Sequence, residues 1–199
     1  TKCSGLRSIV VPNSVKTIGI YAFDGCSELA SISLPYSMEM IGRGAFAECV
    51  KLESITIPHG IGVLSPLLFW RCTKLTSVVI PEDIVEIGHS AFAECSELVS
   101  IDIPKGVVNI GHRCFFNCSK LKSIEIPAGV TLLESEVFSL CTELASIEIP
   151  GNVTAIDSSA FRGCCKLESI NFPDSLSSIM EHAFEGCSQL ITITIPDSV

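Results

Sequence analysis

Apolar and polar residues recur along this chain with a period of 23 residues, without a single insertion or deletion. Each copy reads C-x-x-L-x-S-I-x-I-P-x-x-V-x-x-I-G-x-x-A-F-x-x, and a new Cys then follows. The apolar columns are Cys3, Cys26, Cys49, Cys72, Cys95, Cys118, Cys141, Cys164 and Cys187, together with a Leu column from Leu6 to Leu190 and a Phe column from Phe23 to Phe184. A fixed period of this length indicates a repeat architecture.

The S-I-x-I segment of each copy, such as residues 54–57, alternates polar and β-branched residues. This pattern predicts a short strand with one buried face. The Pro that follows, Pro58 in this copy, ends the strand because it has no N–H to donate.

The rest of each copy is expected to return the chain to the next strand. The V-x-x-I pair, as in Val107 and Ile110, is expected to point inward, and the A-F-x-x-C segment predicts one helical or 3₁₀ turn that faces the core. Glycine follows this pair at Gly19, Gly42, Gly88 and Gly111, which suggests a backbone position with positive φ.

One coil of 23 residues cannot enclose a core, so neighbouring coils must stack and bury their apolar columns against each other. Strands of successive coils are expected to pair in parallel at about 4.8 Å, which gives a rod roughly 40 Å long. We therefore expect residues 1–199 to form a single domain of about nine coils. The coils at the two ends have one neighbour each and are expected to fray or to associate.

Composition limits the classes of function. Apolar residues make up 47% of the chain, but Pro and polar residues interrupt them too regularly for a membrane span of about 20 residues. A net charge of −9 disfavours nucleic acid and anionic membranes as partners, and favours basic or neutral ones. Thr1 already lies in the repeat register, so we expect the chain to be a piece of a longer protein.

The repeat resembles the BspA-like type of leucine-rich repeat over the whole chain. The stretches that carry the resemblance are residues 87–98, IGHSAFAECSEL, and residues 124–127, IEIP. The resemblance implies a right-handed leucine-rich-repeat solenoid, with a short parallel β-sheet on one face and short helical or 3₁₀ turns on the other. It also implies a surface or secreted protein of the adhesin class that contacts host matrix proteins or other cells. One departure is that the Cys column precedes the strand, where ordinary leucine-rich repeats have an Asn or Cys column after it.

Eleven cysteines could indicate a disulfide framework, but nine of them form one column in register. Side chains one coil apart keep the strand spacing of about 4.8 Å, whereas the Cβ atoms of a disulfide lie about 3.8 Å apart. We therefore expect buried, reduced thiols that act as small apolar side chains. Of the remaining two, Cys114 replaces the usual Ala, and Cys165 is the thiol expected to be most exposed.

No residue pattern points to catalysis or to a cofactor. The repeated Ser at 8, 31, 54, 77, 100, 123, 146 and 169 is a surface column, whereas a nucleophile would be singular. His89 and His112 share a repeat position and could in principle bind a metal, but no acid or Cys at matching positions completes a ligand set. We expect no enzyme activity, no metal site and no cofactor.

The strand position between the two buried apolar residues varies from coil to coil, and three successive coils place an acid there. Asp102, Glu125 and Glu148 would lie about 5 Å apart, where like charges repel. Either a basic partner or a cation relieves this repulsion, or Lys105, Lys122 and solvent screen an ordinary charged surface.

A second departure from the repeat lies at residues 64–70, LSPLLFW. Trp70, and Phe116 two coils later, occupy a position that is polar or small in the other coils. They suggest an exposed apolar patch, joined by Leu67 and Leu140, that marks a contact. The alternative is local repacking around Pro66.

Two sequons for N-linked glycosylation, at Asn117 and Asn152, are expected to face outward. The hypothesis from the sequence is a non-enzymatic protein-binding module of a cell-surface or secreted protein. The alternatives are a structural spacer and an intracellular scaffold, and the latter would explain the reduced cysteines.

Overall fold

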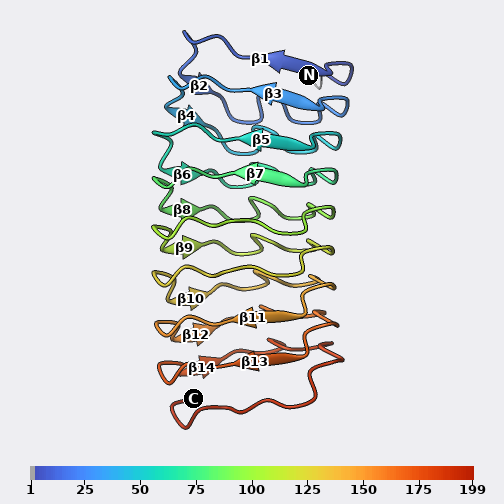
Figure 1. Ribbon diagram of the computed structural model, residues 1–199. Coiled ribbons are helices and arrows are strands. Elements are labelled where there is room, and N and C mark those ends of the chain that lie inside the picture. Colours follow the sequence, from blue (N-terminus) through green and yellow to red (C-terminus); the bar gives the residue numbers. More distant parts are fainter. Residues whose placement is uncertain (1–2) are drawn as a thin grey trace.

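The computed structural model describes residues 3–199. Residues 1 and 2, which the sequence already places in the repeat register, lie outside the described part. The coils stack one on another in chain order, and the two ends of the chain lie at opposite ends of the stack (Figure 1). The predicted solenoid is therefore confirmed.

Parallel strands of successive coils pair with a register step of 23 residues, as in Ser8 with Ser31 and Ser146 with Ser169. The strands of the S-I-x segments are β1 (Ser8–Val10), β3 (Ser31–Ser33), β5 (Ser54–Thr56), β7 (Ser77–Val79), β11 (Ser146–Glu148) and β13 (Ser169–Asn171). They pair as β1–β3, β5–β7 and β11–β13, which confirms the parallel strand on this face. We call the outward side of these segments, with the equivalent residues 100–102 and 123–125, the strand face.

The V-x-x-I segments form a second set of parallel strands that the sequence pattern did not predict. They are β2 (Thr17–Ile18), β4 (Met40–Ile41), β6 (Val63–Leu64), β8 (Glu86–Ile87), β9 (Asn109–Ile110), β10 (Leu132–Leu133), β12 (Ala155–Ile156) and β14 (Ser178–Ile179). Val107 and Ile110 are buried, as expected. Each of these strands has only two residues, too few for an alternation of polar and apolar positions to be recognised.

The core consists of columns that run the length of the stack. Rings of the Phe column stack on each other from Phe23 to Phe184, with interplanar angles of 1° to 23° and centroids 5.4 to 5.8 Å apart. Each column Cys from Cys49 to Cys187 donates its S–H to the carbonyl of the Phe in the preceding coil, as in Cys118 Sγ to Phe92 O at 3.2 Å. The column therefore hydrogen-bonds successive coils together as well as filling space.

The prediction of helical or 3₁₀ turns is wrong, because residues 3–199 contain no helix. The N–H groups of the turn segment alternate between two directions. Cys95 N donates to Phe92 O in its own coil, whereas Phe92 N donates to Cys114 O in the next coil. Residues at two repeat positions, such as Ser90 and Glu94, also have positive φ, which interrupts any helical run.

The expectation of positive φ at the repeated glycines is also wrong, since Gly19, Gly42, Gly88 and Gly111 are not among the residues with positive φ. At Gly42, Gly88 and Gly111 glycine is favoured by the close approach of the preceding coil, whereas a Cβ atom on Gly19 would meet nothing within 4 Å. A Cβ atom on Gly88 would lie 2.6 Å from Pro66 N and 2.8 Å from Leu64 O.

Candidate functional site

The strand face presents two outward columns beside a buried one. In β5, β7 and β11 the middle residue is buried, while the Ser before it and the variable residue after it are exposed. Because the buried residue must pack on the coils above and below, the exposed columns are where the repeats can differ without loss of packing.

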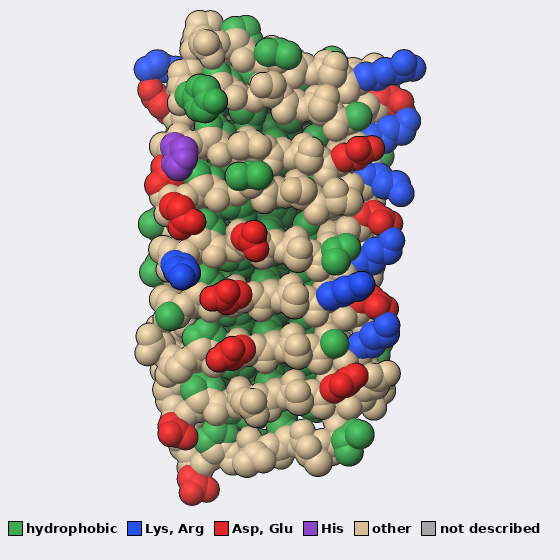
Figure 2. Space-filling view, viewed as in Figure 1, with side chains coloured by type: hydrophobic (Ala, Val, Ile, Leu, Met, Phe, Trp, Pro, Cys, Tyr) green, Lys and Arg blue, Asp and Glu red, His purple; other side chains and the backbone are tan. Residues whose placement is uncertain are grey.

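Three acids occupy the variable column over successive coils. Asp102, Glu125 and Glu148 are all exposed, and Figure 2 shows acidic side chains following one another down the middle of this face. Glu125 and Glu148 are directly paired across neighbouring coils by an isolated parallel bridge. The structure therefore places these acids in one column, as the sequence predicts.

A groove of about 810 Å³ lies along these acids, and we call it the acidic groove. It is lined mainly by residues 100–103 and 123–126 together with Glu148 and Glu82. Residues 100–103 form no strand, and 123–126 form only the single bridge, so the regular ladder is interrupted along the groove. Sequence periodicity could not predict this interruption, because the repeat motif is intact there.

The acids of the groove have no ion-pair partner among residues 3–199. Lys105 lines the same groove, but neither it nor Lys122 comes within 4.0 Å of Asp102, Glu125 or Glu148. Their negative charge is therefore offset only by solvent and by charges farther away.

Acids elsewhere on the surface show a different arrangement, because many pair with a cation one coil away. Lys51 Nζ lies 2.8 Å from Glu28 Oε2, and the same repeat position supplies Lys120 with Glu97 and Lys166 with Glu143, each at 2.7 Å. We call these the ridge pairs. The contrast with the acidic groove shows that acids in this stack can be paired along a column, and that those of the groove are not.

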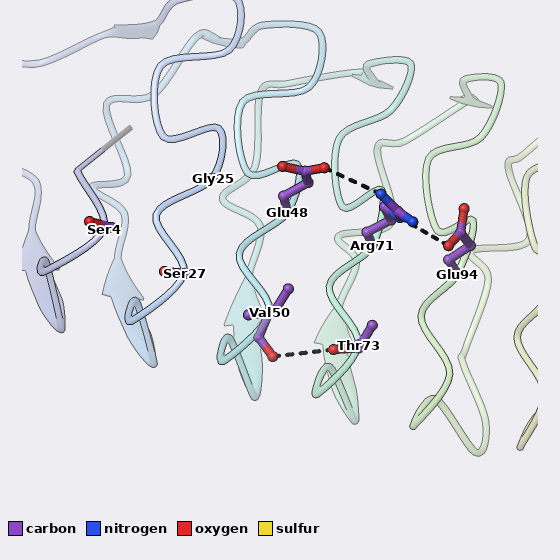
Figure 3. A pocket seen from close by; sticks show the side chains of 8 residues that line it. All are labelled: Ser4, Gly25, Ser27, Glu48, Val50, Arg71, Thr73 and Glu94. Carbon is purple, nitrogen blue, oxygen red and sulfur yellow. Dashed lines mark hydrogen bonds and ion pairs between the residues drawn. The ribbon is translucent and has the colours of Figure 1, made fainter. Parts of the chain in front are cut away.

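A second groove, of about 510 Å³, was not predicted from the sequence. Arg71 lies between two carboxylates there, with Nε 3.0 Å from Glu94 Oε2 and Nη1 3.4 Å from Glu48 Oε1 (Figure 3). Glu94 and Glu48 raise the pKa of the Arg71 guanidinium. The alternation of charge at a spacing of 23 residues could have revealed this cluster.

The two unusual aromatic residues are half-buried, and each is covered by an arginine. Arg71 Cζ lies 5.0 Å from the ring centroid of Trp70, and Arg113 Cζ lies 4.0 Å from that of Phe116. Ala93, in the coil between them, is buried. The guanidinium groups reduce the apolar area that each ring offers to a partner.

The two leucines expected in the same patch are also near the surface. Leu67 is half-buried, and the exposed Leu140 lines a shallow groove of about 440 Å³ together with Phe116. An apolar contact on this side of the molecule stays a prediction.

The two histidines at equivalent repeat positions, His89 and His112, lie in successive coils. Burial, Arg43 and His112 together lower the pKa of His89. His112 Nδ1 lies 2.9 Å from Ser135 O. Within residues 3–199, no group of three or more His, Cys, Asp or Glu side chains is arranged to hold a metal ion.

The column cysteines from Cys26 to Cys187 are buried as expected, the column member Cys3 is exposed contrary to that expectation, and no cysteine in the described part of the chain forms a disulfide. Burial raises the pKa of Cys49 and Cys118 to about 12 and that of Cys187 to about 11. The expectation that Cys165 is the most exposed thiol is wrong. Cys3 is exposed, whereas Cys165 is half-buried, with Sγ 4.0 Å from Thr142 O in a column otherwise occupied mainly by Ser and Thr.

No helix in residues 3–199 is long and apolar enough to cross a membrane. No curated protein sequence matches the chain.

Several solved structures are similar to this one, including the following three. A leucine-rich repeat protein from Bacteroides ovatus is 30% identical, with a TM-score of 0.62, over 92% of this chain and 59% of that protein. The leucine-rich repeat protein of T. pallidum is 29% identical, with a TM-score of 0.69, over 92% of this chain and 78% of that one. The pneumococcal vaccine antigen PcpA is 21% identical, with a TM-score of 0.58, over 97% of this chain and 63% of that one, which shows a common fold only. The chain thus spans about 59% of the length of the Bacteroides protein.

The sequence also matches a profile described as "BspA type Leucine rich repeat region (6 copies)" twice, at residues 1–122 and 85–199. Together the two matches cover the whole chain, and they agree with the repeat columns and with the parallel coils of the structure. The chain belongs to the BspA-type leucine-rich repeat family.

Proposed function

We propose that this chain is the protein-binding repeat region of a cell-surface or secreted protein of the adhesin class, and that it binds a basic segment of a host matrix or cell-surface protein in the acidic groove. Leucine-rich repeat proteins are generally protein-binding, non-enzymatic modules, and solenoids offer extended surfaces for such contacts. Family membership supports the surface location.

The observation that carries the proposal is the difference between paired and unpaired acids. The ridge pairs neutralise their carboxylates within the molecule, whereas Asp102, Glu125 and Glu148 are exposed along a groove without an ion-pair partner among the described residues. Bringing cations of a partner to this column would relieve repulsion between carboxylates on neighbouring coils, whose backbones are about 5 Å apart. Interactions of this kind raise association rates and weaken with salt.

Trp70 and Phe116 form the second part of the proposed contact surface, on the turn side of the coils. Their rings are half-buried under Arg71 and Arg113. A partner that displaced or stacked on these guanidinium groups would use both the ring and the charge.

The experiment compares two variants with the same change in net charge. One replaces Asp102, Glu125 and Glu148 by Ser, and the matched control replaces Glu28, Glu97 and Glu143, the acids of the ridge pairs, by Ser. The probe is a ten-residue oligolysine peptide, whose binding is measured by fluorescence anisotropy over a series of salt concentrations.

We expect the groove variant to lose at least tenfold in affinity at low salt, about 1.4 kcal/mol, and to lose most of its salt dependence. The control should lose less than about threefold, since its acids are already paired. Equal losses in both variants would mean that net charge alone attracts the peptide. Unchanged affinity in the groove variant would sink the proposal and favour a structural spacer.

A further inference from the structure

Two N-linked glycosylation sequons occupy different surroundings in the stack. Asn152, in the sequence Asn152-Val153-Thr154, is exposed in the turn that follows β11 and Pro150. Asn117, in the sequence Asn117-Cys118-Ser119, is half-buried, and the next residue, Cys118, is fully buried in the cysteine column. A bulky, hydrated glycan is compatible with the first position and not with the second.

The surface around Asn152 is open. The equivalent positions of the two preceding coils are Gly129 and Gly106, both exposed and without side chains. A Cβ atom on the neighbouring Gly151 would meet nothing within 4 Å. An oligosaccharide on Asn152 therefore has free space along the side of the stack.

The amide of Asn152 is held in place by the preceding coil, since Nδ2 donates to Ala128 O at 3.0 Å. A glycosylated asparagine keeps one hydrogen on this nitrogen. The hydrogen bond to Ala128 can therefore survive the modification, and the folded turn need not change.

The backbone at Asn117 is more constrained. This residue has a φ of 56°, and its N–H donates to Ser139 O at 2.7 Å. It lies between the half-buried Phe116 and the buried Cys118. A glycan there would have to project from a tightly packed turn segment, so the folded state would tolerate it poorly.

We propose that Asn152, and not Asn117, is the acceptor of an N-linked oligosaccharide when the chain passes through a glycosylating export pathway. The donor class is a polyprenyl-pyrophosphate-linked oligosaccharide. Nδ2 of Asn152 forms a bond to the sugar C1 and loses one proton, while the bond from C1 to the pyrophosphate oxygen breaks and polyprenyl pyrophosphate leaves.

The glycan would stand at the rim of the acidic groove, because Ala128, Pro150 and Gly151 are among the residues that line that groove. This consequence rests on the proposed function. An oligosaccharide at this rim would hinder the approach of a basic segment to Glu125 and Glu148, so modification would reduce partner binding.

The test expresses the 199-residue chain with an added secretion signal in mammalian cells and maps glycans by mass spectrometry in both medium and cell extract. The wild type, Asn117→Gln and Thr154→Ser should each carry one glycan, since Ser also completes a sequon. Asn152→Gln and Thr154→Ala should carry none. A wild type without a glycan in both fractions, or a glycan on Asn117, would overturn the assignment.

Binding is measured separately with the oligolysine peptide. The glycosylated wild type should bind at least threefold more weakly than both the Asn152→Gln variant and the unglycosylated wild type made in bacteria. Equal affinity would remove the effect on the groove. If none of the three forms bound the peptide, the proposed function would fail, while the glycan map would still decide the acceptor.

Discussion

The cysteine column and the variable column of the strand face recur at the same 23-residue spacing, yet they differ in what they tolerate. Position by position, the first is Cys in every coil and is buried from Cys26 onward, whereas the second changes from Val79 to Asp102 and from Glu148 to Asn171. Each thiol of the first column must pack between the adjacent coils and donate to a Phe carbonyl, as Cys118 does to Phe92 O, whereas the second column faces solvent. The fold depends on the first column, and the second is free to determine what the surface binds.

The largest expected effect comes from removing the protons of the buried column. Unfolded thiols lose their protons above about pH 8.5. Burial keeps the folded thiols protonated, with the pKa of Cys118 raised to about 12. The unfolded state then binds fewer protons, so the stability is complete below about pH 8.5 and falls as the pH rises towards the folded pKa values, by about 1.4 kcal/mol per thiol per pH unit.

Summed over the buried thiols, this loss of stability reaches on the order of 10 kcal/mol about one pH unit above pH 8.5. That is comparable to the whole stability of a typical domain. Circular dichroism as a function of pH, with a reductant present, should show unfolding between about pH 9 and 11. The double variant Cys95→Ala and Cys118→Ala has two fewer thiols to titrate. Relative to its stability at pH 7, it should therefore lose less stability than the wild type as the pH rises. An unchanged spectrum up to pH 11 would contradict this account.

Removal of one core ring should produce the next largest effect. Phe115 is fully buried between Phe92 and Phe138, at centroid distances of 5.5 and 5.7 Å. Phe115→Ala should lower the free energy of unfolding by about 3 to 5 kcal/mol, because it leaves a cavity in the stack. Glu125→Ala, in the variable column, should change it by less than about 0.5 kcal/mol. Urea denaturation would measure both, and similar values would remove the distinction between the columns.

Two glycines at the same repeat position should respond differently to alanine. Gly88→Ala should cost about 1 to 3 kcal/mol, because the new Cβ would meet the backbone of the preceding coil. Gly19 has nothing within 4 Å, so Gly19→Ala should be neutral or stabilise by up to about 1 kcal/mol. If the two changes had equal effects, close approach would not explain the glycine at this position.

The smallest effect concerns the single tryptophan. Acrylamide, a neutral quencher, should quench Trp70 to an extent between those of a buried and a free indole, since the ring is half-buried below Arg71. Arg71→Ala should increase quenching and leave the unfolding free energy nearly unchanged. A fully shielded ring in the wild type would exclude Trp70 from any contact surface.

Much of the fold could be predicted because it depends only on which residue type recurs at each position of the repeat. The parallel register of Ser8 with Ser31 and the burial of Phe115 and Cys118 follow from a period without insertions. The second set of strands and the turns could not be predicted. In the turns, residues as different as Tyr21, Ser90 and Glu136 adopt the same positive φ, because hydrogen bonds to the next coil, and not residue type, fix the backbone.

The candidate site was predictable in part. Asp102, Glu125 and Glu148 lie in one column as the pattern requires. The interruption of the ladder beside them, and the lack of an ion pair between these acids and Lys105 or Lys122, depend on coil spacing and side-chain reach, which a linear pattern does not contain.

Hydrogen exchange of the wild-type chain with and without bound oligolysine tests the separation of the two columns most directly. Peptides that contain residues 100–103, 123–126 and 146–148 should be protected on binding. The turn segments around residues 70–71 and 113–116 carry Arg71 and Arg113, which repel oligolysine, so these segments and the buried cysteine column should exchange as in the free chain. Protection confined to these turn segments, or spread evenly along the stack, would contradict the assignment of binding to the strand face.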